Sequence, residues 1–181
     1  ARVTELFGPI PRGTTVRYEQ KEPPMLGETR LTLIQDTQVP RLTMGWRSMP
    51  ILDPREPMLD LVSGILSGDK TSRLEKALVD TGLAAQAYCY SDTRRDDGVF
   101  MVGVQPAPGH TLDECEAVVR KVVAEMAEKG PTAEELARAR TKLIAEQTFG
   151  LESSDGYASR LGSLAVVGDW RYVLRYPKAL E

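Results

Sequence analysis

Histidine, asparagine and long apolar stretches are what this sequence lacks. It contains one histidine, His110, and no asparagine, so the N-x-Ser/Thr acceptor of N-linked glycosylation is absent. No apolar run approaches the ~20 residues of a membrane-spanning helix, and residues 1–6 have no apolar core of a signal peptide. The printed residues therefore predict no membrane span and leave the cellular compartment open.

The same scarcity limits metal and nucleophile chemistry. A zinc site needs three or four converging ligands, which one histidine cannot supply. Serine and cysteine hydrolases need a base, usually histidine, and His110 is the only candidate. We expect His110 to be a loop residue without a metal role, and we identify no catalytic residue and no metal ligand.

Charges are balanced and scattered along the chain. Lys and Arg number 23 and Asp and Glu 26, for a formal charge of −3, whereas a nucleic-acid surface needs clustered basic residues. Cys89 and Cys115 are the only cysteines. A disulfide between them is not excluded, but two buried free thiols are the favoured interpretation. The composition predicts a globular protein that binds no nucleic acid.

Residues 61–78 predict the tail of one helix, a glycine turn and a second helix. The first helix has an apolar stripe at i, i+3, i+4 and i+7, formed by Met58, Leu61, Val62 and Ile65. Asp53 is its expected N-cap, Glu56 the capping-box partner, and Gly68 its end. The second helix is expected to pack through Leu74, Ala77 and Leu78.

The turn at Gly68–Thr71 has a slight likeness to a phosphate-binding loop. That motif requires Gly directly before Lys and another Gly five residues earlier, whereas Asp69 separates Gly68 from Lys70. We expect a helix–helix turn in which Asp69 or Thr71 caps the second helix. Residues 94–97 are interpreted similarly, as a solvated hairpin tip rather than a recognition patch.

Four stretches have the alternation or the apolar character of strands: residues 31–34, 42–46, 85–90 and 99–104. A polar turn separates the last two, so we expect them to pair antiparallel. Residues 99–104 are apolar on both faces and should lie in the centre of the sheet.

The second half of the chain predicts helices. Thr111 with Glu114, and Thr132 with Glu135, form capping boxes. A shorter helix is expected from Ser153 or Ser154, and another within residues 168–176. The residues expected to be buried on these helices are Leu112, Cys115, Val119, Val122, Met126, Leu136, Ala139, Leu143, Ile144, Tyr157, Leu161 and Leu164. The order of elements indicates an α+β domain, an antiparallel sheet with helices packed on one face.

Residues 1–28 hold two proline clusters and few periodic apolar residues, which is typical of a linker. We expect residues 1–24 to be the tail of a preceding domain plus a linker. Residues 25–181 then form one domain, truncated at its C-terminus.

Five segments, in order and at matching spacing, resemble the pitrilysin/insulinase family of zinc peptidases, the inverzincins. The segments are Phe7–Arg12, Val39–Leu42, Leu66–Leu74, Gly130–Arg140 and Gly168–Arg171. They resemble the family's second type of domain, which follows the metal-bearing domain in each half of the molecule. The resemblance implies an antiparallel sheet with helices on one side, and a non-catalytic role.

In that family an inverted H-x-x-E-H motif and a downstream Glu hold zinc, and the motif's Glu activates water. One histidine cannot supply the motif. An Arg and a Tyr bind substrate in the family's substrate-binding half, but the matching positions here fall near Val79 and Ala85, which cannot do so. The resemblance therefore implies no cofactor in this chain and zinc in the preceding domain of the parent protein.

The first hypothesis is a non-catalytic domain that helps to enclose a peptide in the peptidase chamber. Its implied partners are the preceding catalytic-type domain, the complementary half of the peptidase, and peptide substrate, held by pairing along a sheet edge. The candidate substrate-binding residues are Gly68, Asp69, Lys70, Thr71 and Ser72. The resemblance also points to an exported bacterial protein of the periplasm.

The alternative is an inactive structural subunit of the processing-peptidase or respiratory-core type, in which the same fold serves in assembly. A free-standing module that binds a small ligand is a third hypothesis. The domain that precedes residue 1 separates the first two, because it either carries H-x-x-E-H or has lost it.

Overall fold

The computed structural model describes residues 2–14, 23–37 and 39–180. The chain divides into two units, Ala1–Asp36 and Thr37–Glu181, and each is described by itself. The first unit contains α1 (Arg2–Phe7), a short helix that the sequence did not predict and that has no buried side chain. The predicted boundary between residues 24 and 25 stays a prediction.

The strand predicted at residues 31–34 is wrong. This segment has an irregular backbone, and Leu31, Leu33 and Ile34 are 77%, 70% and 97% exposed. Alternating apolar residues indicate that one face of an extended segment could be buried. A strand also needs a neighbouring strand that completes its hydrogen-bond ladder. The described part of the sheet has no ladder with this segment.

The second unit is built on three antiparallel strands, β1 (Leu42–Ser48), β2 (Ala84–Asp92) and β3 (Gly98–Pro106). Their order in the sheet is β1-β3-β2, which confirms the central position predicted for β3. Register places Trp46 opposite Phe100 across the β1–β3 pair, and their ring centroids lie 6.4 Å apart. The sheet is therefore held together by aromatic packing as well as by ladder hydrogen bonds.

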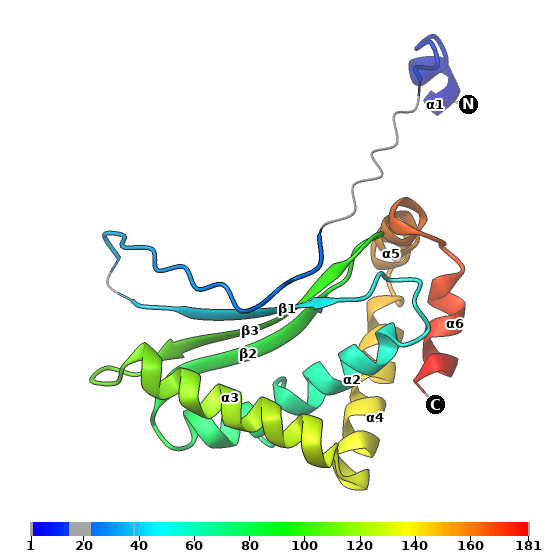
Figure 1. Ribbon diagram of the computed structural model, residues 1–181. Helices are drawn as coiled ribbons and strands as arrows, with labels where there is room; N and C mark the ends of the chain where they lie inside the picture. Colours follow the sequence, from blue (N-terminus) through cyan, green and yellow to red (C-terminus); the bar gives the residue numbers. More distant parts are fainter. Residues whose placement is uncertain (1, 15–22, 38, 181) are drawn as a thin grey trace. The chain divides into compact units, whose positions relative to one another are not determined.

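Helices cover one face of this sheet, as the sequence predicted (Figure 1). They are α2 (Glu56–Leu66), a short π-helix, η1 (Glu75–Val79), and α3 (Leu112–Lys129). A further helix, α4 (Ala133–Gly150), packs against α2. The core between the helices and the sheet includes Ile65, Leu66, Leu74, Leu78, Val102, Val104, Cys115, Val119, Val122 and Met126. Cys89 and Cys115 are both buried and free, as favoured from the sequence.

Both predicted capping boxes are present. The Thr111 hydroxyl accepts from the Glu114 N–H at 3.2 Å, and the Glu114 carboxylate accepts from the Thr111 N–H at 2.7 Å. Thr132 and Glu135 make the same pair at the start of α4. These caps form locally because both partners lie within three residues of each other.

The predicted start of α2 is wrong. Arg55 occupies the N-cap position without a side-chain cap, and the Asp53 carboxylate instead accepts from the Arg55 N–H at 2.9 Å. Glu56 does not close a capping box but points into the protein, where it is 2% exposed. Met58 is also wrong as a core residue, because it is 61% exposed.

Two further helices, α5 (Ser154–Val167) and α6 (Tyr172–Ala179), complete the unit. They lie beyond the end of the sheet that carries the β2–β3 turn (Figure 1). α5 begins where the sequence predicted, and Ser153 caps it by accepting from the Gly156 N–H at 3.0 Å. Of the side chains expected to be buried there, Leu164 is buried, Leu161 is half-buried and Tyr157 is 44% exposed, so the prediction for Tyr157 is wrong.

Candidate functional site

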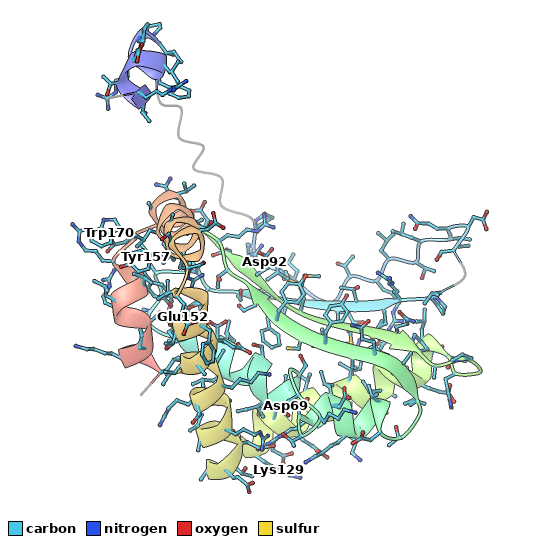
Figure 2. The ribbon with its side chains drawn as sticks, turned by 180° about the vertical axis from the view of Figure 1, so that it is seen from behind. Asp69, Asp92, Lys129, Glu152, Tyr157 and Trp170 are labelled. Carbon is cyan, nitrogen blue, oxygen red and sulfur yellow. The ribbon has the colours of Figure 1, made fainter. Side chains whose placement is uncertain are left out.

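The turn between α2 and η1 brings together the five predicted substrate-binding residues, Gly68, Asp69, Lys70, Thr71 and Ser72. Figure 2 shows Asp69 on the helical side of the sheet. Gly68 has a φ of +130°, a backbone conformation that L side chains rarely adopt. Its carbonyl oxygen accepts from the Nζ of Lys142 on α4.

Most polar groups of this turn are already bonded within the protein. The Asp69 carboxylate accepts from the Thr71 N–H at 2.7 Å and from the Thr71 hydroxyl at 2.5 Å. These bonds, the hydroxyl's above all, lower the pKa of Asp69. Ser72 is buried and donates to the Asp69 carbonyl at 2.6 Å, whereas Lys70 is exposed. The bonds are those of a helix–helix turn, and the substrate-binding role stays a prediction.

Arg73, directly after this turn, anchors it to the start of α4. Its guanidinium donates to both carboxylate oxygens of Glu135, at 2.8 and 2.7 Å, and to the Gly130 carbonyl at 3.0 Å. The guanidinium, by these hydrogen bonds, lowers the pKa of Glu135 to about 2. The sequence identified Glu135 as a capping residue but gave no signal for its second partner, 62 residues away.

A buried cluster of two acids and two tyrosines joins α2 to α6, and we call it the acid–tyrosine cluster. The Tyr172 hydroxyl donates to Glu56 at 2.5 Å, and the Tyr176 hydroxyl donates to Asp60 at 2.6 Å. The two acids are four residues apart on α2, and the two tyrosines are four residues apart on α6. Each acid can therefore face one tyrosine across the contact between the helices. That shared spacing is the only signal of the cluster in the sequence, and our sequence analysis missed it.

Burial dominates the acid–base behaviour of this cluster. It raises the pKa of Glu56, to which the nearby Asp60 charge also contributes, and it raises the pKa of Asp60. It raises the pKa of both tyrosines as well. Groups with pKa values moved in this way occur at functional sites and in structural networks alike, and here each hydroxyl is satisfied by a carboxylate.

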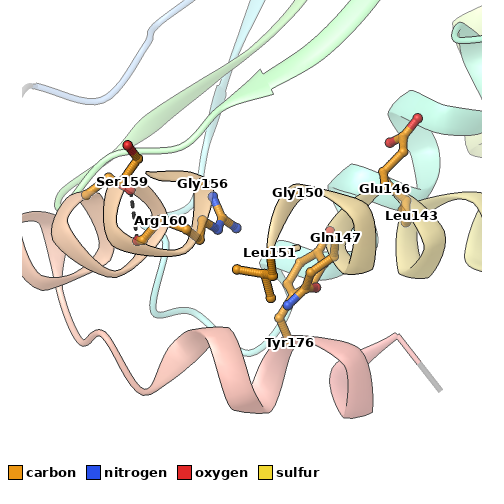
Figure 3. Close-up of a pocket in the computed structure, with 10 residues that line it drawn as sticks. Leu143, Glu146, Gln147, Gly150, Leu151, Gly156, Ser159, Arg160 and Tyr176 are labelled. Atoms are coloured by element: carbon orange, nitrogen blue, oxygen red, sulfur yellow. Dashed lines mark hydrogen bonds between the residues drawn. The ribbon is translucent and has the colours of Figure 1, made fainter. Parts of the chain in front are cut away.

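A cavity of about 550 Å³ adjoins the cluster, and we call it the interhelical hollow. It opens between the end of α4, one face of α5, and Tyr176 of α6 (Figure 3). The residues that line it are Leu143, Glu146, Gln147, Gly150, Leu151, Gly156, Ser159, Arg160, Ser163 and Tyr176. In the close-up the Arg160 side chain extends toward Leu151, and Gln147 lies beside Tyr176.

The face of the sheet turned away from the helices carries a tyrosine pair. Tyr88 and Tyr90 on β2 are exposed and stacked, with centroids 6.2 Å apart and planes 17° from parallel. Tyr88 lies across Gly103 of β3, where a Cβ atom would approach the ring to 2.1 Å. Glycine at 103 therefore lets an aromatic ring lie flat on the sheet, which gives an amphipathic surface.

The described residues do not fit a zinc site. They include no group of three or more His, Cys, Asp or Glu residues that could hold a metal ion. His110 lies beside the capping box of α3, with its Nδ1 3.5 Å from Glu114. Burial raises the pKa of the Cys89 thiol to about 12, which opposes the thiolate form that binds metals. None of the helices in the described part of the chain is long and apolar enough to cross a membrane.

Comparisons with known proteins connect this architecture to a family. A family model described as Peptidase M16 inactive domain matches residues 1–143. An uncharacterized zinc protease of Mycobacterium leprae is 30% identical over 90% of this chain and 37% of its own length. One from Bacillus subtilis is 25% identical over 78% of this chain and 34% of its own length.

A solved structure is similar to this chain in both sequence and fold. A domain from Bordetella parapertussis, described as an inactive peptidase domain, has a TM-score of 0.72 and 25% identity, covering 83% of this chain and 82% of that one. The chain spans about a third of the length of its curated relatives. These findings confirm the resemblance to pitrilysin and insulinase: the chain belongs to the family of peptidase M16 inactive domains, the non-catalytic domains of zinc proteases.

Proposed function

We propose that this chain is the non-catalytic part of a zinc endopeptidase, where it packs beside a catalytic-type domain and helps to enclose a peptide substrate. The observation that carries the proposal is the family match over residues 1–143 in a chain that has one histidine in all. A zinc site of the inverted type needs two histidines and a glutamate, so the metal and the activated water come from another domain.

The sheet supports this proposal by its form. Helices occupy one face, and the other presents the stacked pair Tyr88 and Tyr90. Tyrosine offers a large contact area together with a hydroxyl, so a tyrosine surface can contact peptides of varied sequence. In the order β1-β3-β2 the outer strands are β1 and β2, and a sheet edge can hold an extended peptide through its backbone.

The test uses the parent reading frame, extended upstream by one domain. We expect one bound zinc per extended chain and cleavage of an unstructured peptide that a chelator abolishes, if necessary after the complementary half is added. The matched control replaces the upstream domain's H-x-x-E-H glutamate with glutamine, which should retain zinc and lose cleavage. A folded extension with neither zinc nor cleavage overturns the proposal and favours the structural subunit.

The predicted contact at Gly68–Ser72 has a test in the same protein. Lys70 is the exposed member of the turn with a charged side chain. If the turn touches substrate, Lys70→Ala raises KM for the peptide severalfold and leaves zinc content unchanged. An unchanged KM removes Lys70 from the list of substrate-binding residues.

A further inference from the structure

The interhelical hollow has two facing walls at helical spacing. α4 contributes Leu143, Glu146, Gln147 and Gly150, and α5 contributes Gly156, Ser159, Arg160 and Ser163. Both sets follow i, i+3, i+4 and i+7, the pattern of a helix contact face. On α5 this face consists of small or polar residues, so the two helices do not interlock and about 550 Å³ lies open between them. That volume falls within the roughly 300–1,000 Å³ of small-ligand sites.

Gln147 lines this hollow and carries a buried, unsatisfied acceptor. Its Nε2 donates to the Val173 carbonyl at 3.0 Å, and its Oε1 is buried without a hydrogen-bond partner among the described residues. Turning the amide over does not help, because the Val173 carbonyl needs a donor. A buried acceptor without a partner destabilises the protein, and a ligand N–H that bonded to it would remove that penalty.

Arg160 supplies the complementary donor. Its guanidinium extends toward Leu151 (Figure 3) and makes no hydrogen bond or ion pair with the part of the chain described here. Its positive charge counteracts only part of the rise that burial causes in the pKa of Glu56 and Asp60. Glu146 also lines the hollow. Arg160 thus opposes a cationic ligand while Glu146 opposes an anionic one, which leaves a neutral group that both donates and accepts.

We propose that the interhelical hollow binds an unfolded peptide chain through one apolar residue. The apolar side chain packs against Leu143 and Leu151, and the backbone amide donates to Gln147 and accepts from Arg160. A peptide backbone is the neutral donor–acceptor that this pair of groups fits. The choice of peptide as occupant rests on the proposed function, and it adds a second contact for the substrate, on the helical side of the sheet.

Binding is tested on this chain by NMR, with N-acetyl-leucine methylamide as the probe. We expect saturable shifts of the backbone amides of Gln147, Gly150, Gly156 and Arg160. The neutral probe should bind at least fivefold more tightly than N-acetyl-leucine, which is an anion, or leucine methylamide, which is a cation. Stronger binding of either charged probe, or no shifts at the hollow, overturns the proposal.

Two glycines give a matched pair of variants. A Cβ atom on Gly150, which lines the hollow, meets nothing within 4 Å, and the same holds for Gly162, which does not line it. Gly150→Phe should fill the hollow and weaken probe binding at least tenfold, whereas Gly162→Phe should leave it unchanged. Ser159→Leu is a second filling variant, on the opposite wall, in case Gly150→Phe does not fold. Equal binding by a folded filling variant and by the control overturns the proposal.

The upstream-extended protein separates this inference from the proposed function. There, Gly150→Phe should raise KM for an unstructured peptide at least threefold with zinc content and kcat unchanged. An extension without zinc or cleavage would refute the proposed function alone, because probe binding to this chain is read directly by NMR. An active extension whose KM is the same with Gly150→Phe and Gly162→Phe would refute the substrate contact.

Discussion

Tyr172 and Tyr176 each donate a hydroxyl hydrogen to a carboxylate of α2, and neither bond joins residues close in sequence. Their partners lie 116 residues earlier in the chain. Local pairs behave differently: the capping boxes at Thr111 and Thr132 were predictable because a donor and an acceptor three residues apart meet whenever a helix begins. At the scale of single residues, the range of the interaction decides what sequence reasoning can find.

Removal of one hydroxyl tests the acid–tyrosine cluster. Tyr172→Phe takes the donor at 2.5 Å away from Glu56, which is 2% exposed. We expect the free energy of unfolding to fall by about 1–3 kcal/mol, because a buried acceptor loses a partner. Urea denaturation measures the change, with Tyr157→Phe as the control at an exposed tyrosine. Equal effects of the two variants would contradict a structural role for the bond.

The pH dependence of stability gives a second test of the cluster. Burial raises the pKa of Glu56 in the folded state above its ordinary 4.5, so the folded protein holds this proton more firmly than the unfolded chain. The contribution is therefore complete below pH 4.5 and is lost as pH rises through the raised value. We expect wild type to lose stability relative to Glu56→Gln across that interval. A difference in unfolding free energy between wild type and Glu56→Gln that stays flat across this pH interval would refute the prediction.

The contribution of Glu135 to stability should change with pH in the opposite direction. Its pKa is lowered from 4.5 to about 2, chiefly by the Arg73 hydrogen bonds, so its contribution is complete above pH 4.5 and is lost as pH falls toward 2. Glu135→Gln should lower the unfolding free energy by about 1–3 kcal/mol at pH 7, as expected for a charge-assisted pair. The difference from wild type should vanish near pH 2. A difference that persists there would assign the effect to the helix cap instead of the ion pair.

At the scale of elements, the helices and the three strands of the sheet were predictable, whereas one further segment with strand-like alternation forms no strand in the described structure. Residues 99–104 are apolar on both faces, and they form the central strand β3. Residues 31–34 have a clean alternation and form no strand in the described structure, because pairing depends on a neighbour that the local pattern does not specify. Tyr157 was expected inside on helical periodicity, yet α5 turns a face of small and polar residues toward α4 and leaves that tyrosine exposed.

The turn after α2 depends on Gly68. With φ at +130°, an alanine there would be strained at a cost of about 1–3 kcal/mol. We expect Gly68→Ala to lower the unfolding free energy by that amount, as measured by urea denaturation. Gly162→Ala is the matched control, and it should be neutral or stabilising because its Cβ enters open space in a helix. A neutral Gly68→Ala would show that the turn relaxes and does not depend on glycine.

At the scale of the whole molecule, the chain has the fold of its family, and its described residues include no group of three or more potential metal ligands. After incubation with one equivalent of zinc and dialysis, we expect less than about one tenth of an equivalent to remain bound, because a tight site needs three or four ligands. Atomic absorption measures the zinc. Cys115→Ser is the control, since a buried thiol should make no difference. Stoichiometric zinc that resists dialysis would contradict this prediction.

The sequence by itself determined the α+β class, the paired strands β2 and β3, both capping boxes and the family resemblance, which the family comparison and the structural neighbour confirm. These depend on local periodicity and on short motifs. Only the tertiary structure placed Glu56 inside, joined it to Tyr172, and opened the hollow between α4 and α5. The physical reason is that burial and cavity volume are properties of surfaces brought together by distant parts of the chain, and no local pattern records which surfaces will meet.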